Sequence, residues 1–208
     1  MNGISRHIFL VRHGETDWNK QDVFRGHTDI PLNAAGRAQA EALGRRFAQI
    51  PLQSIHSSRL SRALDIARAI AQGQKSPPAA QIEEGLLDIH RGQWEGLSHE
   101  EARKKFPEMY RKWLTDPAQM RFPGGESLRS VQHRAWRFLG RMLVSGEGSA
   151  VLVSHDVVIR VLFCSMLDLD LSFMGRFEVH PASVSEIRCD GGRPILSRIN
   201  DICHLGTK

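Results

Sequence analysis

Two histidines and two arginines follow apolar runs in this sequence, at points where a strand is expected to end. Arg12 and His13 come directly after "HIFLV", His155 follows "AVLVS", and Arg62 lies just beyond "SIHSS". Arginine is always charged, and its planar fork matches the oxygens of a phosphate group. A neutral imidazole can attack phosphorus when its other nitrogen is held as a donor. These four groups could therefore transfer a phosphoryl group without a metal ion, because that reaction mainly requires positioning and charge neutralisation.

Each of these signals is weak when it stands alone. A single histidine at a strand end is more often a polar turn residue, and "RHG" after a strand is a short pattern. The four residues gain significance if they meet at one edge of a sheet, since ligands of open α/β sheets collect at the carboxyl ends of the strands. Gly14 would let backbone N–H groups approach an anion at that edge.

The elements that would position these residues alternate between strands and helices. Apolar runs and helical periodicity predict strands at 8–12, 54–58, 150–156, 182–189 and 195–200, and helices at 34–49, 59–72, 98–106, 108–115, 127–144 and 157–167. This alternation favours an α/β fold, a three-layer sandwich with a mostly parallel central sheet and helices on both faces. The chain, 1–208, is expected to be a single domain. Glycines and prolines punctuate a small helical cap inserted at about 86–126.

Local signals mark where some of these elements begin and end. Asn33 and Ser127 are the expected N-caps of the helices at 34–49 and 127–144. The segment "GQKSPPAA" at 73–80 is predicted to be a loop. The apolar face of the first of these helices is expected to consist of Ala38, Ala42, Leu43, Phe47 and Ile50.

Composition excludes several classes of protein. The 208 residues are 41% apolar and 25% charged, which is typical of a globular domain. The net charge of +5 is scattered and no nucleic-acid motif appears, so no nucleic-acid partner is expected. No apolar run approaches the roughly 18 residues of a membrane span, and the one before Arg12 is too short for a secretory signal, which predicts a cytoplasmic protein with no membrane partner. Cys164, Cys189 and Cys203 lack metal-ligand spacing and are expected to be thiols.

Six segments of the sequence resemble one protein family. "LVRHGETDWN", "GHTDIPLNAAGRAQA", "SSRLSRALDIA", "GQWEG", "PGGESL" and "VLVSHD" closely resemble the histidine phosphatase superfamily, in the branch that contains cofactor-dependent phosphoglycerate mutase. The resemblance runs from about residue 8 to 190. It implies that His13 is the nucleophile that becomes phosphohistidine, that Arg12 and Arg62 bind the phosphoryl group, and that His155 stabilises its charge in the transition state.

The resemblance also suggests substrate-binding residues beyond these four. Asn19 matches a position that often contacts phosphate in this branch, and its alternative is a side chain that stabilises a loop. Gly26 and Thr28 are further candidates near the entrance. Phe24, His27 and His90 could line that entrance.

The proton donor has three candidates. The family places a carboxylic acid ahead of the glycine-tryptophan segment, and in "LLDIHRGQWEG" that position is Asp88, where many relatives have glutamate. The acid would protonate the leaving alkoxide and then take a proton from water. Asp156 is an alternative, because the acid phosphatase branch uses a His-Asp pair. Glu95, in "WEG", more simply makes a structural hydrogen bond. Asp88 is favoured.

The same residues would serve a phosphatase or a mutase. A mutase must hold a bisphosphate, which requires additional basic residues in the cap. Here Arg103, Arg111 and Arg121 fit a solvated helix face or the cap rim, so hydrolysis of a small phosphorylated metabolite is the expected activity. The compact cap resembles those of alpha-ribazole phosphatases and broad-specificity phosphatases. Mutase-type transfer is the alternative, and a phospho-ligand binding protein without turnover is a third. No metal or other cofactor is expected, and family analogy alone suggests a homodimer.

Overall fold

A six-stranded sheet forms the centre of the computed structural model, which describes residues 6–145, 148–189 and 193–206. The strands lie in the order β3-β2-β4-β1-β5-β6. The first four are mutually parallel, β5 is antiparallel to β1, and β6 is antiparallel to β5. The predicted mostly parallel α/β sheet is thereby confirmed. The six strands are β1 Arg6–Arg12, β2 Leu52–Ser57, β3 Ala80–Ile82, β4 Ser149–Ser154, β5 Val184–Cys189 and β6 Ile195–Asp201.

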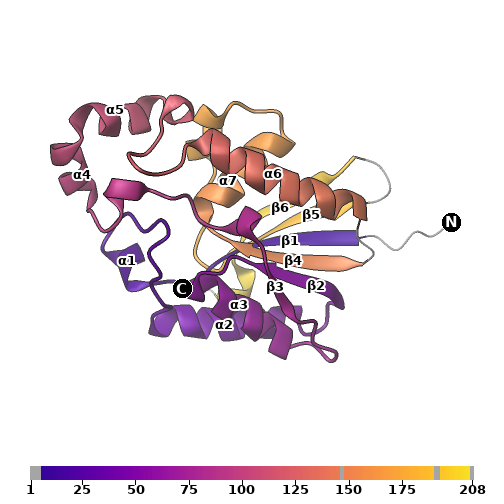
Figure 1. Ribbon diagram of the computed structural model, residues 1–208. Coiled ribbons are helices and arrows are strands. Elements are labelled where there is room, and N and C mark those ends of the chain that lie inside the picture. Colours follow the sequence, from indigo (N-terminus) through magenta and orange to yellow (C-terminus); the bar gives the residue numbers. More distant parts are fainter. Residues whose placement is uncertain (1–5, 146–147, 190–192, 207–208) are drawn as a thin grey trace.

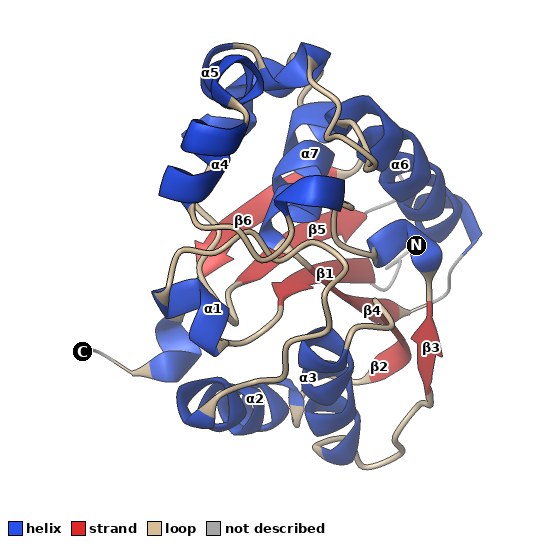
Figure 2. Cartoon of the chain, turned by 60° about the vertical axis from the view of Figure 1, so that its left-hand side comes forward, coloured by secondary structure: helices blue, strands red, loops and turns tan. Residues whose placement is uncertain are grey.

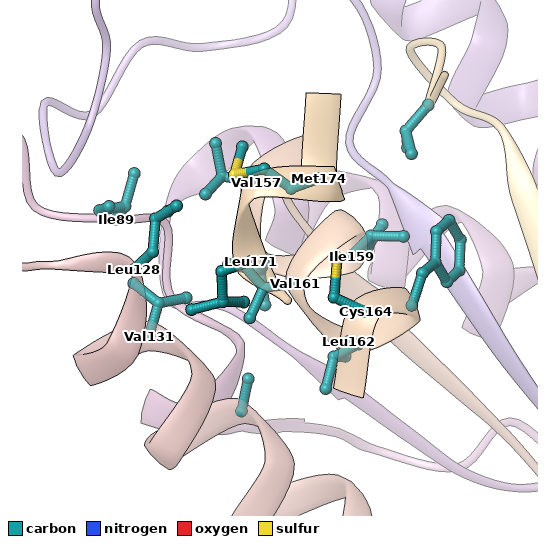
Figure 3. Close-up of a cluster of buried hydrophobic side chains, with 14 of the residues drawn as sticks. Ile89, Leu128, Val131, Val157, Ile159, Val161, Leu162, Cys164, Leu171 and Met174 are labelled. Atoms are coloured by element: carbon teal, nitrogen blue, oxygen red, sulfur yellow. The ribbon is translucent and has the colours of Figure 1, made fainter. Parts of the chain in front are cut away.

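Helices cover both faces of the sheet, because successive side chains of a strand point to opposite faces. In β1, Phe9 and Val11 belong to the apolar core under α2 (Ala34–Phe47) and α3 (Ser61–Gln72). Ile8 and Leu10 belong to the core under α6 (Leu128–Ser145) and α7 (Asp156–Met166). Figures 1 and 2 show the two helix pairs on opposite sides of the sheet. Figure 3 shows the core between α6 and α7. The predicted three-layer arrangement is confirmed.

The local predictions hold with two exceptions. Asn33 Oδ1 accepts a hydrogen bond from the Gly36 N–H (2.9 Å), and Ser127 Oγ accepts one from the Ser130 N–H (3.2 Å), so both are N-caps. Ala38 is exposed, because the buried face of α2 runs through Ala40, Leu43 and Phe47 instead. Strand β3 was not predicted from the sequence. This strand has three residues and its Gln81 and Ile82 are exposed, so it carries no apolar run.

The segment predicted as a cap lies beyond the carboxyl ends of the parallel strands, where Figure 1 shows α4 and α5. Its core is the fully buried side chain of Trp94, whose ring centroid lies 5.1 Å from those of both Phe24 and Phe122. Trp94 belongs to the same apolar cluster as Ile8 and Leu10 of β1, so the cap core is continuous with the sheet core. The segment contains α4 (His99–Lys105), α5 (Pro107–Thr115) and two 3-10 turns, at Gly92–Trp94 and Pro117–Gln119, and a third turn, at Glu84–Leu86, leads into it.

The remaining elements are short. Helix α1 (Asp17–Lys20) follows β1 directly, and 3-10 turns at Leu171–Arg176 and Cys203–Leu205 follow α7 and β6. Within the described part of the chain, no helix is long and apolar enough to cross a membrane.

Candidate active site

The four residues singled out from the sequence meet at the carboxyl edge of the parallel strands. In the sheet, β4 lies between β1 and β2, and Arg12 at the end of β1 stands opposite Ser154 at the end of β4. His13 follows β1 and His155 follows β4, each at the point where the chain leaves the sheet. The ring centroids of the two histidines lie 5.1 Å apart. Arg62 reaches the same place from the first turn of α3, which follows β2. All four side chains are buried or nearly so.

The turn after His13 is held by direct backbone packing. A Cβ on Gly14 would lie 2.9 Å from the carbonyl oxygen of Gly36, in the first turn of α2. A Cβ on Gly36 would lie 2.1 Å from the carbonyl oxygen of Glu15. Only two glycines allow the loop and the helix to come this close. Gly14 therefore fixes the loop that carries His13.

The imidazole of His13 has a defined tautomer. Its Nδ1 lies 2.7 Å from the carbonyl oxygen of Gly14. A carbonyl can only accept, so Nδ1 carries the hydrogen and Nε2 has the free lone pair. Burial lowers the pKa of His13 well below its usual value, and the positive charge of Arg62, the second histidine and Arg12 lowers it further. His13 is therefore neutral at neutral pH, as a nucleophile must be.

Around His13, donors outnumber the protein acceptors. Arg62 has five N–H groups and donates to the carbonyl oxygens of Thr28 and Gly26 (both 2.9 Å) and to Asp88 Oδ2 (3.2 Å). Its buried Nε has no hydrogen-bond partner among the described residues, and the same holds for Nε of Arg12 and for the two ring nitrogens of His155, one of which carries a hydrogen in the neutral ring. Buried unpaired donors are unfavourable. Several of them converging on one place suit an anion with many acceptor oxygens, such as phosphate.

Asp88 lies against two of these groups. Its Oδ2 is 3.2 Å from Arg62 Nη2 and 3.6 Å from His155 Nδ1, and its Oδ1 accepts a hydrogen bond from its neighbour's backbone N–H. Two side chains hold its backbone, because His27 Nε2 (2.8 Å) and Arg134 Nη2 (2.9 Å) both contact the Asp88 carbonyl oxygen. The carboxyl group is thus fixed beside the place where phosphate would lie.

The other two candidate acids, Asp156 and Glu95, have surroundings that differ from those of Asp88. Burial acts to raise the pKa of Asp156, but Arg12 and Arg160 outweigh it and lower that pKa far below its usual value. Asp156 is therefore an unsuitable proton donor at neutral pH. Glu95 Oε1 accepts the backbone N–H groups of His27 (2.9 Å) and Arg91 (3.1 Å). Glu95 ties the entrance loop to the cap, which agrees with the structural hydrogen bond expected for it.

The three further candidates contact their neighbours in specific ways. Asn19 Oδ1 accepts from the backbone N–H and the hydroxyl of Thr16, which caps α1. Gly26 and Thr28 both face Arg62 through their carbonyl oxygens, and the Thr28 hydroxyl donates to Glu95. Gly26 has a φ of +56°. The positions of Gly26 and Thr28 therefore orient the guanidinium of Arg62.

A pocket of about 250 Å³ opens beside Asp88. Phe24 lines it, as expected, whereas His27 and His90 stack on each other with ring centroids 4.6 Å apart and are not part of its wall. Three arginines that the sequence analysis did not single out also line it, namely Arg25, Arg91 and Arg160. Arg25 directly precedes Gly26, Arg91 precedes "GQWEG" and Arg160 is one turn after Asp156, so proximity to the recognised motifs was the available signal.

Among the described residues, no group of three or more His, Cys, Asp or Glu side chains could hold a metal ion. A buried neutral imidazole surrounded by arginines at the carboxyl edge of an α/β sheet is the arrangement of a phosphoryl-transfer enzyme that neutralises charge with side chains. The sequence model of the histidine phosphatase superfamily, branch 1, matches residues 8–202, and the chain belongs to this family.

Similar proteins support the assignment and the hydrolytic activity. Phosphoserine phosphatase 1 of Hydrogenobacter thermophilus is 34% identical over 96% of this chain and 94% of its own length. Adenosylcobalamin/alpha-ribazole phosphatase of Salmonella typhimurium is 30% identical over 88% of this chain and 91% of its own. The structure of an Entamoeba histolytica phosphoserine phosphatase with 3-phosphoglyceric acid matches with a TM-score of 0.84 and 27% identity, over 96% of this chain and 99% of that one. The chain is a phosphoric monoester hydrolase of the phosphohistidine type, as predicted.

Proposed function

We propose that this enzyme hydrolyses phosphate monoesters of small carboxylic acids, with His13 as the nucleophile and Asp88 as the proton donor. The observation that carries the proposal is the neutral His13 ring, whose Nδ1 donates to the Gly14 carbonyl and whose Nε2 is free to attack. Two of the similar proteins are named for phosphoserine, and one was solved with 3-phosphoglyceric acid. Both compounds carry a carboxylate as well as the phosphate.

In the first step, the substrate phosphoryl group lies among the donors of Arg12, Arg62 and His155, which offset its charge. Nε2 of His13 forms a bond to phosphorus while the bond from phosphorus to the ester oxygen breaks. Asp88 donates its proton to the departing alkoxide. The mechanism therefore requires that the carboxyl group of Asp88 carries this proton when the substrate is bound.

In the second step, water attacks the phosphohistidine. Asp88, now a carboxylate, accepts a proton from that water while the oxygen bonds to phosphorus. The bond from phosphorus to Nε2 breaks, inorganic phosphate leaves, and His13 returns to its neutral form. Each proton and phosphoryl group that enters the cycle leaves it, so no further reagent is required.

Hydrolysis is favoured over mutase-type transfer by the outward direction of the three cap arginines singled out from the sequence. Arg103, Arg111 and Arg121 are all exposed, which agrees with the solvated face expected for them. They supply no additional charge to the site for a second phosphate. Formation of 2-phosphoglycerate from 3-phosphoglycerate and a bisphosphate primer, faster than phosphate release, would reverse this choice.

Four further expectations belong to the same proposal. We treat 1–208 as one domain with 86–126 as its cap, which is supported by the continuous core around Trp94. The thiols of Cys164 and Cys203 suit a reducing compartment such as the cytoplasm. The homodimer and the lack of a nucleic-acid partner stay predictions.

The test is phosphate release in EDTA from a panel of phosphoserine, 3-phosphoglycerate, alpha-ribazole phosphate, a sugar phosphate and an aryl phosphate. We expect release that is fastest from the two acids and is lost in His13→Asn, which keeps a similar shape without a nucleophilic nitrogen. Release by the variant at the wild-type rate would refute the role of His13. A preference for alpha-ribazole phosphate would refute the substrate class alone.

A further inference from the structure

Arg91 is a buried cation enclosed by aromatic rings. It is 9% exposed, and its guanidinium carbon lies 5.0 Å from the ring centroid of Phe24, 5.2 Å from that of Trp113 and 5.1 Å from that of Phe122. Rings that pack on a guanidinium occupy its faces and leave the in-plane N–H groups available. Within the described part of the chain, the buried Nη1 of Arg91 has no hydrogen-bond partner. A buried charged donor of this kind calls for an acceptor.

The backbone holds Arg91 rigidly at this position. Its N–H donates to Glu95 Oε1 (3.1 Å). The next residue, Gly92, has a φ of +53°, and a Cβ there would lie 2.0 Å from the carbonyl oxygen of Pro123. The turn is therefore fixed against the far end of the cap segment. A donor held in place by its surroundings loses little conformational freedom when it binds a ligand.

The other charges around the pocket leave an excess of positive charge. Arg25 and Arg160 line the same pocket, and the buried Nε of each lacks a partner among the described residues. Asp156 Oδ2 lies 3.9 Å from Arg160 Nη2, and Asp22 is at the rim with an 83% exposed side chain, 3.6 Å from His99. With Arg12 and Arg62, the five arginines outnumber the acids Asp88 and Asp156 by three. A phosphate dianion offsets two positive charges, so positive charge remains for a carboxylate on the substrate, and more of it remains when Asp88 carries its proton.

The size and place of the pocket suit the rest of a small acid. Asp88 and Asp156 form part of its wall, so it adjoins the phosphoryl site. Its 250 Å³ corresponds to the volume of roughly eight water molecules. Val157 of α7 and Met174 supply apolar wall, and Figure 3 shows them side by side at one end of the core. This volume is sufficient for a chain of about three carbons, and both Asp88 and Arg91 line it.

We propose that Arg91, with Arg25 and Arg160 beside it, binds the carboxylate of the substrate and selects phosphorylated acids over other phosphate esters. This inference rests on the proposed function, because it concerns the same site. The planar fork of Arg91 offers two parallel N–H groups, which match the two oxygens of a carboxylate. Arg91 is then a specificity-determining residue that contributes nothing to the chemistry at phosphorus.

The experiment compares substrates that differ only in the carboxylate. Phosphoserine is paired with phosphoethanolamine, and 3-phosphoglycerate with glycerol 3-phosphate; an aryl phosphate reports the chemistry alone. The wild-type enzyme should prefer the acid of at least one pair more than tenfold in kcat/KM. Arg91→Met should lower kcat/KM for that acid about 10- to 150-fold, which corresponds to one hydrogen bond to a charged group. It should change kcat/KM for the partner lacking the carboxylate less than threefold.

Arg137→Met, which removes an exposed arginine from α6, is the matched control. It should leave kcat/KM unchanged for both members of the pair. Equal losses on both members of a pair in Arg91→Met would overturn the inference. Should that variant fail to fold, Arg91→Lys keeps the charge without the fork and should still lose most of the preference. Wild-type enzyme that shows no preference within either pair overturns the inference while leaving the phosphatase intact. Wild-type enzyme that releases phosphate from none of the five compounds refutes the proposed function itself.

Discussion

Replacing Asp88 with asparagine separates proton donation from the other duties of this side chain. Asparagine has nearly the same shape and retains an oxygen that can accept the Ile89 N–H, a contact of 2.9 Å in the native protein. It cannot donate a proton to a leaving oxygen. The charge-assisted contact with Arg62 (3.2 Å) is weakened as well, but this affects every substrate in the same way.

The size of the effect depends on the leaving group. An alkoxide such as that of serine departs slowly without a proton, and general acid catalysis is worth about 10²–10⁴ in rate. This corresponds to about 2.7–5.4 kcal/mol of activation free energy. A nitrophenolate is a stable leaving group without a proton. Hydrolysis of p-nitrophenyl phosphate is therefore slowed only by the weakened contact with Arg62, which affects all substrates alike. The ratio of kcat/KM for phosphoserine to that for p-nitrophenyl phosphate should therefore fall at least 100-fold in Asp88→Asn.

Initial rates of phosphate release and of nitrophenolate absorbance measure this ratio directly. Asp156→Asn is the control, because the low pKa of Asp156 keeps that carboxyl group ionised and so without a proton to donate. We expect Asp156→Asn to lower kcat/KM for both substrates by the same factor. An unchanged ratio in Asp88→Asn, or a 100-fold fall in Asp156→Asn, would refute the assignment of the acid.

The remaining predictions concern the nucleophile, the second histidine and the loop glycine. Rapid acid quench of wild-type enzyme with ³²P-labelled substrate should trap label on protein, and His13→Asn should trap none; label on the variant would place the nucleophile elsewhere. Burial and, next, the charge of Arg62 lower the pKa of His155 well below its usual value. Below pH 6.5 the unfolded chain therefore binds a proton at this residue that the native protein does not bind. The free energy of unfolding falls as the pH falls for this reason. Urea unfolding between pH 6.5 and 5 measures how steeply the free energy of unfolding depends on pH. This dependence should be smaller by about 1 kcal/mol per pH unit in His155→Asn than in the wild type, and an equal dependence would contradict a neutral His155. Gly14→Ala should cost about 1–3 kcal/mol of unfolding free energy, because its Cβ meets the Gly36 carbonyl at 2.9 Å, and unchanged stability would show that the loop can move away.

The sequence predicted the parts of the site that lie on the sheet. The runs before Arg12 and His155 are apolar over their whole length because β1 and β4 are covered on both faces, so the strand ends could be located to within two residues. The order of the parallel strands then brings the two histidines together. These features depend on short stretches of chain and on general rules of α/β topology.

The sequence could not predict which arginines are buried. Arg91 and Arg134 look like any surface arginine in a basic chain, since arginine is mostly exposed in proteins. Arg91 is buried and Arg134 is half-buried because the cap folds against them, through contacts such as that between Arg134 and Glu126 (2.9 Å) and that of Arg91 with three rings. Gly26 shows a related limit, because it acts through its carbonyl oxygen, a group that every residue carries.

In the mechanism proposed for His13, the contact between its Nδ1 and the Gly14 carbonyl also determines which isomer of phosphohistidine forms. With Nδ1 engaged as a donor, phosphorus can bond only to Nε2, the nitrogen farther from the main chain. Phosphorylation makes the ring a cation, so the N–H on the opposite nitrogen becomes more acidic and its hydrogen bond to the carbonyl becomes charge-assisted. A peptide dipole thus stabilises the intermediate through the far side of the ring, where neither substrate nor water has to pass. Isomer-specific detection of the trapped phosphoprotein would report the tautomer of the resting enzyme.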